Sequence, residues 1–169
     1  MDLGGITMAK WVIGSGLEEY MAQLQDLAEH TDDVIKKGIY EGAAVVTSAI
    51  RNATASIPVD EGMGTPQHKL SGINRVQKAG LLSGLGIAHM KREGQGWNTK
   101  VGFDGYNNVK TKKYPGGQPN ALIARSVESG TSFRAPHPFV APASRKAKAA
   151  AEKAMEVAID AAIEAIIKE

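Results

Sequence analysis

Three closely spaced prolines, Pro136, Pro138 and Pro142, most tightly limit how this chain can fold. Each proline holds φ at about −65° and lacks a backbone N–H donor, so the segment favours an extended conformation and cannot lie inside a sheet. Pro142 also suits the first turn of a helix. Phe139 and Val140 lie between these prolines and need a hydrophobic seat. That seat is either the domain's own core or the surface of a neighbouring subunit.

Helical periodicity is found at both ends of the chain. A long helix is predicted over residues 142–167, and two helices are predicted near the N-terminus. The first of these begins near Leu17, and the second begins at Thr31, which suits an N-cap, and runs to about residue 55. Pro58 ends it, because the residue before a proline disfavours the helical conformation. The apolar stripe of the last helix consists of Met155, Ile159, Ile163 and Ile166.

The middle of the chain predicts a small antiparallel sheet between two long loops. Residues 85–91 and 97–103 alternate in polarity as strands do, with a glycine-containing turn between them, which predicts a β-hairpin. His89 falls on the apolar phase of its strand and is expected to be packed. The loops are residues 58–80 and 104–119. A short helix over residues 121–129 is expected to be capped by Asn120 and ended by Gly130.

These elements predict a single α+β domain over residues 1–169, with two N-terminal helices, a small antiparallel β-sheet and a long C-terminal helix. The absence of cysteine excludes disulfides, thiol catalysis and cysteine-based metal sites. The sequence has neither a run of about 18 apolar residues nor a signal-peptide core, so we expect no membrane span and synthesis in the cytoplasm.

Charge is unevenly distributed along the chain, although the formal net charge is only +2. Residues 1–61 carry ten acidic and four basic side chains, whereas residues 69–113 carry nine basic and two acidic ones. Such asymmetry can steer a nucleic acid or an acidic protein surface toward the basic half. It can equally bring copies of the chain together, acidic half to basic half, in a head-to-tail ring.

No catalytic, cofactor-binding or metal site is predicted, and we do not expect an enzyme. Each of the four histidines is isolated, without the short spacing of paired metal ligands. Ser132 follows a glycine and a threonine in a turn, without the strained elbow that presents a serine nucleophile.

Nucleic-acid binding has more support than catalysis. Bases and aromatic side chains on a sheet are typical of surfaces that bind single strands. On the predicted hairpin and the loop after it, Trp97, Tyr106 and Tyr114 lie among basic residues. The alternative function is therefore that of a small nucleic-acid-binding protein. Its candidate contacts are Lys91, Arg92, Lys100, Lys110, Lys112 and Lys113.

A specific pattern surrounds the three prolines. Residues 127–132 read V-E-x-G-T-S, and residues 136–143 read P-x-P-F-x-x-P-A, just before the last helix. This pattern resembles the signature of the phage tail-completion family, the head–tail joining or neck proteins of long-tailed phages. Other segments agree in order: Gly16 and Leu17 before the first helix, Ile57 and Pro58 after the long one, and the stretches at 79–83 and 101–102. The resemblance covers residues 11–167.

The resemblance implies a structural virion protein of the neck, assembled in the bacterial host cytoplasm, without a cofactor. It would finish the tail and help join it to the DNA-filled head. The implied partners are further copies of itself, six by analogy with tail symmetry, tail terminator or tail-tube proteins, and head-side stopper or connector proteins. The basic residues would meet an acidic subunit surface or the DNA in the channel. The residues expected at the subunit interface are Val127, Glu128, Thr131, Arg134, Pro138, Phe139 and Val140.

Overall fold

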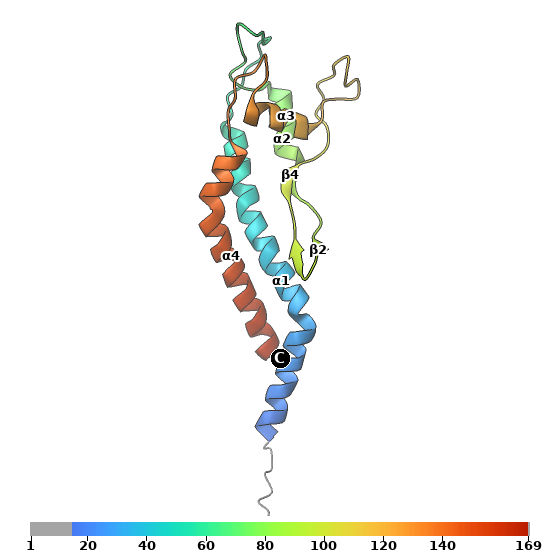
Figure 1. The fold of residues 1–169 in the computed structure, drawn as a ribbon, viewed down its shortest axis with the longest axis vertical. Helices are drawn as coiled ribbons and strands as arrows, with labels where there is room; N and C mark the ends of the chain where they lie inside the picture. The colour runs from blue at the N-terminus through green and yellow to red at the C-terminus, as the bar shows by residue number, and fades with distance from the viewer. Residues whose placement is uncertain (1–14, 169) are drawn as a thin grey trace, which may run out of the picture.

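A computed structural model describes residues 15–168 of the chain. Two long helices, α1 (Ser15–Ser56) and α4 (Val140–Lys168), run side by side in opposite directions and form a rod (Figure 1). The segments between them build a lobe at the upper end of this rod. Its elements are α2 (Arg75–Gly84), β1 (Leu85–Ile87), β2 (Lys91–Glu93), β3 (Gly96–Asn98), β4 (Val101–Phe103) and α3 (Asn120–Ser129). The predicted α+β class and the long C-terminal helix are confirmed.

The prediction of two N-terminal helices is wrong, because α1 is continuous through Thr31. The Thr31 hydroxyl donates to the Leu27 carbonyl, four residues back, at 2.9 Å. Threonine can use its hydroxyl either to cap a new helix or to bond within an existing one, and sequence alone does not separate the two uses. The start of α1 at Ser15 also places Gly16 and Leu17 inside the helix rather than before it.

Close packing of α1 against α4 depends on two glycines one turn apart. A Cβ at Gly38 would lie 2.6 Å from Cγ1 of Ile159, and one at Gly42 would lie 2.5 Å from Cγ of Met155. The two bulky side chains of α4 therefore occupy the space that side chains on α1 would need. Buried alanines on both helices also allow the two helices to pack closely along the rod.

Replacing Gly38 with leucine is therefore expected to lower the free energy of unfolding by about 1–3 kcal/mol, the usual range for an overpacked contact. This loss is expected although leucine favours helices more than glycine does. Urea denaturation followed by circular dichroism measures it. Tyr40→Leu is the control, because Tyr40 is exposed on the same helix. An equal midpoint for the two variants would contradict the close packing.

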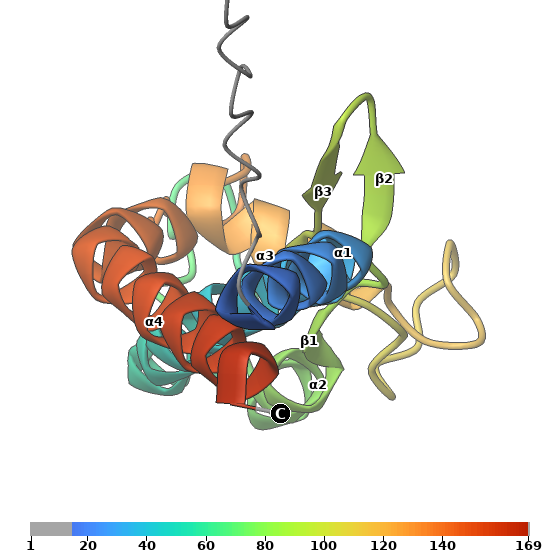
Figure 2. The same cartoon turned by 90° about the horizontal axis from the view of Figure 1, so that it is seen from below.

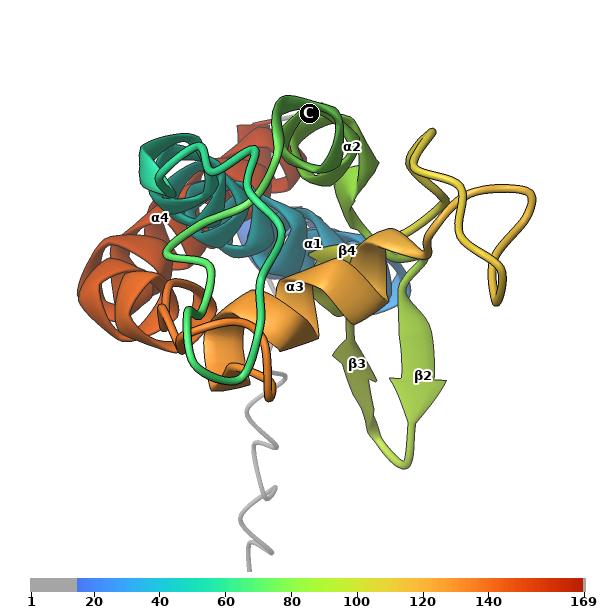
Figure 3. The ribbon, with the colours of Figure 1, turned by 90° about the horizontal axis from the view of Figure 1, so that it is seen from above.

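The main hydrophobic core lies in the lobe, where the rod joins it. Figures 1 and 3 show α2 and α3 beside the upper part of α1, where the two short helices also contact each other. The ends of α1 and α4, the base of the hairpin and the two short helices all contribute side chains. The core consists of Ile50, Ile57, Ile73, Leu81, Leu85, Ile123, Ala124, Val127 and Phe139.

The long loop predicted over residues 58–80 ends earlier than expected, because α2 begins at Arg75. Its start is a capping box: the Asn74 side chain accepts from the N–H of Gln77 at 2.8 Å, and the Gln77 side chain accepts from the N–H of Asn74 at 3.4 Å. This signature is legible in the sequence, but the flanking glycines led to a loop prediction. Residues 104–119 are a loop, as predicted.

The predicted hairpin is confirmed, with a bulge in its middle. β1 pairs with β4 from Leu85 opposite Phe103, and β2 pairs with β3 from Lys91 opposite Asn98. Residues 88–90 therefore face only residues 99 and 100, and this extra residue shifts the alternation of the strand by one. The prediction that His89 is packed is wrong for this reason, since the side chain is exposed.

The short helix α3 also differs from its predicted start. Asn120 is its first residue rather than its cap, and the buried Asn120 side chain donates to the Asp104 carbonyl at 2.8 Å. Pro119 occupies the N-cap position without a side-chain hydrogen bond. Gly130 ends the helix with φ of 72°, as predicted, in a region that disfavours other residues.

Candidate interaction surfaces

The end of α3 caps the start of α4. The Glu128 carboxylate accepts hydrogen bonds from the backbone N–H groups of Phe139, Val140 and Ala141 at 2.7, 2.9 and 3.1 Å. First-turn N–H groups have no partner within their own helix, and a negative charge is favoured at that end. The N–H of His137 adds a bond to the Val127 carbonyl at 2.7 Å. The last turn of α3 therefore fixes where α4 begins.

This arrangement shifts the acidity of Glu128. Burial raises the pKa of its carboxyl, but the three backbone donors, helped by the positive charge of Arg145, outweigh burial. The pKa therefore lies below its ordinary value of 4.5. The carboxylate is thus held in its charged form, the form that caps the helix.

The chain itself provides the seat for Phe139. Its side chain is only 4% exposed, and its ring lies 5.9 Å from that of Phe103, tilted by 52°. Val127 is buried in the same core, and Val140 packs against it from the first turn of α4. Of the two alternatives left open by the sequence, the structure places Phe139 in the core of its own domain.

Arg134 ties the strap, which we define as residues 130–139, to the rest of the lobe. Its buried guanidinium donates through Nη1 to the Gly72 carbonyl and through Nη2 to the Gln77 side chain at 3.5 Å. Burial lowers the pKa of Arg134, and the negative charge of Asp60 works against this shift. Backbone bonds between Leu70 and the strap run beside it. Arg134 therefore holds two segments together inside one chain.

The structure divides the predicted interface residues by exposure. Val127, Arg134 and Phe139 are buried within the chain, whereas Pro138 is exposed. The other three, Glu128, Thr131 and Val140, are half-buried. The buried members therefore shape the strap and position α4. A direct contact with a partner stays a prediction, and it concerns the outward-facing part of the strap.

The predicted basic surface is partly engaged by α1. Nη1 of Arg92 lies 3.2 Å from Oδ2 of Asp32, and Nε1 of Trp97 donates to Oδ1 of the same carboxylate at 3.0 Å. The ammonium of Lys36 lies 4.4 Å from the centroid of the Trp97 ring. Asp32 of the acidic half of the sequence thus contacts Arg92 of the basic half within one chain. The tryptophan expected to stack on bases instead packs against the rod.

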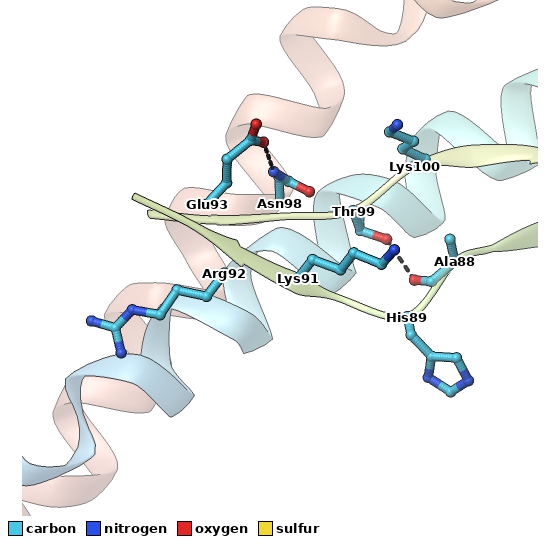
Figure 4. A pocket seen from close by; sticks show the side chains of 8 residues that line it. All are labelled: Ala88, His89, Lys91, Arg92, Glu93, Asn98, Thr99 and Lys100. Carbon is cyan, nitrogen blue, oxygen red and sulfur yellow. Dashed lines mark hydrogen bonds between the residues drawn. The ribbon is translucent and has the colours of Figure 1, made fainter. Parts of the chain in front are cut away.

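The remaining basic residues form two separate groups. Lys91 and Lys100 are exposed around a shallow pocket of about 400 Å³ at the bulge, and the Arg92 side chain points away from them toward α1 (Figure 4). Lys110, Lys112 and Lys113 are exposed on loop 104–119, which extends from the lobe in a different direction from the hairpin (Figure 2). The structure does not bring the six residues into one patch.

A groove that the sequence analysis missed lies between α1, α4 and the strap, with a volume of about 660 Å³. Small apolar side chains of both helices form most of its floor, and Pro138 of the strap and Pro142 of α4 lie at one end. The sequence signal was the recurrence of alanine in both helices. Its lining includes Val45, Ala49, Ala53, Pro138, Pro142, Lys146 and Ala150.

Within residues 15–168 there is no cluster of three or more histidine, aspartate or glutamate side chains placed to hold a metal ion. No helix in this range has the length and apolar character needed to cross a membrane. Ser129 and Ser132 are exposed in the turn after α3.

Comparison of the chain with protein-family models, with curated proteins and with solved structures found no match.

Proposed function

We propose that this protein is a structural component of the neck of a long-tailed phage, where it completes the tail and helps join it to the DNA-filled head. The proposal rests on the V-E-x-G-T-S and P-x-P-F-x-x-P-A segments, which resemble the signature of tail-completion proteins. The protein acts through contacts with further copies of itself and with neck and tail proteins rather than by catalysis.

The positions of the signature residues give this proposal a physical rationale. Glu128 caps α4, Phe139 anchors its start in the core, and Arg134 fixes the strap to loop 58–73. Together they hold a long rod in a fixed direction relative to the lobe. A protein that joins two assemblies needs such rigidity, because a contact at one end then determines the position of the other.

Deletion of the gene from a phage that carries it tests the proposal. We expect the lysate to contain DNA-filled heads and separate tails under the electron microscope, and we expect a plasmid copy to restore joined particles. Normal numbers of joined particles without the gene would refute the proposal. Capsid genes upstream and tail-tube genes downstream in the same genome would support it independently.

The exposed lysines retain a role in this proposal, either at an acidic subunit surface or against DNA in the channel. Titration of the purified protein with double-stranded DNA at low and moderate salt distinguishes the two, because contacts with phosphates weaken steeply as salt rises. Salt-sensitive binding that disappears when Lys110, Lys112 and Lys113 are changed to glutamate assigns this loop to DNA. Absence of binding at low salt assigns it to a protein surface.

A further inference from the structure

The lower end of α1 extends beyond its partner helix. The Gln23 side chain donates to the Ile167 carbonyl at 3.2 Å, so α4 ends at the level of Gln23. Among residues 15–168, no other helix lies beside the first turns of α1, which continue past this point (Figure 1). We call residues 15–24 the tip.

One face of the tip is apolar and exposed. Leu17, Tyr20, Met21 and Leu24 are 45%, 57%, 61% and 48% exposed. Their spacing places all four side chains on the same side of the helix. Single exposed apolar residues are common, but a contiguous group of this kind marks a binding surface.

The surroundings of this stripe are strongly acidic. Residues 15–33 contain no lysine or arginine. They contain six acidic residues: Glu18, Glu19, Asp26, Glu29, Asp32 and Asp33. The tip therefore suits a partner surface that is apolar in the middle and basic at its edge.

The groove between α1, α4 and the strap has these properties. Its lining consists mostly of small apolar side chains and includes one cation, Lys146, with Asn52, Ser56 and His137 as its other polar members. Arg145 and Lys148, next to Lys146 on the first turns of α4, are also exposed. Two acidic residues lie near this basic edge: Glu41 is a turn below the lining residue Val45 on α1, and Glu152 lies 3.7 Å from Lys148. Shape and charge thus complement the tip.

The elongated shape leaves much of the surface of the chain exposed. The chain exposes 11978 Å². A compact monomer of 17.9 kDa exposes about 8000 Å² by the usual scaling. The chain is therefore more extended than a compact monomer of its size, which leaves its surfaces open to a partner.

We propose that the tip of one copy docks into the groove of a second copy of this chain. The contact cannot form within one copy, because Met21 and Ala49 lie on the same continuous helix, about 42 Å apart at 1.5 Å per residue. A contact between two different surfaces of identical chains repeats from copy to copy and produces a ring or a filament. The ring arrangement rests on the proposed function, whereas the contact itself rests on this surface complementarity.

Disulfide trapping tests the contact directly, because the chain contains no cysteine. Purified Met21→Cys is mixed with purified, differently tagged Ala49→Cys and oxidised under mild conditions. We expect a covalent heterodimer that carries both tags. The control mixture of Met21→Cys with Tyr40→Cys is expected to give at least about tenfold less heterodimer, although Tyr40 is more exposed than Ala49, because Tyr40 lies outside the groove. Equal yields in the two mixtures would refute the proposed contact.

Sedimentation of the unmodified protein provides a second test. Met21→Asp with Leu24→Asp is expected to weaken self-association by at least about 30-fold, the effect of losing one central interface residue. Tyr40→Asp is the matched control and should associate normally. A wild-type protein that remains monomeric at high concentration, or an aspartate variant that associates as tightly as the wild type, would overturn the proposal.

The two proposals can fail separately. If Met21→Cys and Ala49→Cys form the tip–groove disulfide but deletion of the gene leaves joined particles, the contact is preserved and the neck function is refuted. A deletion that abolishes joining, together with a failed disulfide experiment, would preserve the function and refute the contact.

Discussion

Replacing Phe139 with alanine is expected to lower the free energy of unfolding by about 3–5 kcal/mol, the usual cost of removing a buried aromatic ring. The ring is almost fully buried against Phe103 in the core that joins lobe and rod. The alanine variant would leave a cavity at this position and so weaken the packing between the start of α4 and the lobe. Because a typical domain has a total stability of about 5–15 kcal/mol, this loss is a large fraction of it. Urea denaturation at low protein concentration measures it as a lower midpoint with an unchanged slope.

Phe133→Ala is the matched control, because this residue lies on the same strap but is 46% exposed. Phe133→Ala is expected to change the free energy of unfolding by no more than about 0.5 kcal/mol. Phe139→Leu should fall between the two, since leucine fills much of the space. A Phe139→Ala protein as stable as Phe133→Ala would show that the ring is not part of the core. If Phe133→Ala nevertheless impairs head–tail joining, the outward side of the strap contacts a partner.

The elements that could be predicted from the sequence are those specified by local chemistry. The prolines before α4, the periodicity of its apolar residues and the glycine turn of the hairpin each act within a few residues. Predictions failed where a residue type allows two local structures, and where an extra residue in a strand changes which side chains face the core. The Thr31 hydroxyl bonds backward instead of starting a helix, and the bulge at residues 88–90 reverses the phase on which His89 was placed.

The candidate site was harder to predict, because its contacts join distant parts of the chain. Glu128 and the backbone groups that it caps belong to different helices, and Arg134 reaches Gly72 and Gln77 from more than fifty residues away in the sequence. The residues of the strap could be selected as a group, but their burial could not. The charge asymmetry was also visible, yet sequence alone did not show that Asp32 already binds Arg92 and Trp97 within one chain.

Replacing Glu128 with alanine is expected to destabilise the protein by about 2–3 kcal/mol, because three backbone N–H groups at the start of α4 lose a charged acceptor. Glu128→Gln should lose less, since an amide oxygen can still accept without the charge. Glu152→Ala is the control: its carboxylate lies on the exposed surface of α4, 3.7 Å from Lys148, and is expected to contribute less than about 1 kcal/mol. Chemical denaturation at neutral pH compares the three.

The pH dependence of stability separates the charge of Glu128 from its size. The pKa of Glu128 is lower in the folded protein than its ordinary value of 4.5, so its contribution to stability is fully present above pH 4.5. This contribution is lost as the pH falls below 4.5 and passes through the lower pKa of the folded state. The difference in the free energy of unfolding between wild type and Glu128→Gln should therefore be constant above about pH 6, roughly one and a half units above the ordinary pKa, and should shrink on acidification.

Hydrogen exchange over the same pH range tests whether the capping carboxylate holds the start of α4 separately from the rest of the helix. Protonation of Glu128 releases N–H groups at the first turn of α4, while Phe139 remains in the core. As pH falls below 4.5, protection against hydrogen exchange, corrected for the intrinsic rate at each pH, is therefore expected to decrease at Val140 and Ala141 before it decreases along the rest of α4. A uniform loss of protection along the helix would mean that α4 unfolds as one unit and that Glu128 has no separate role at its start.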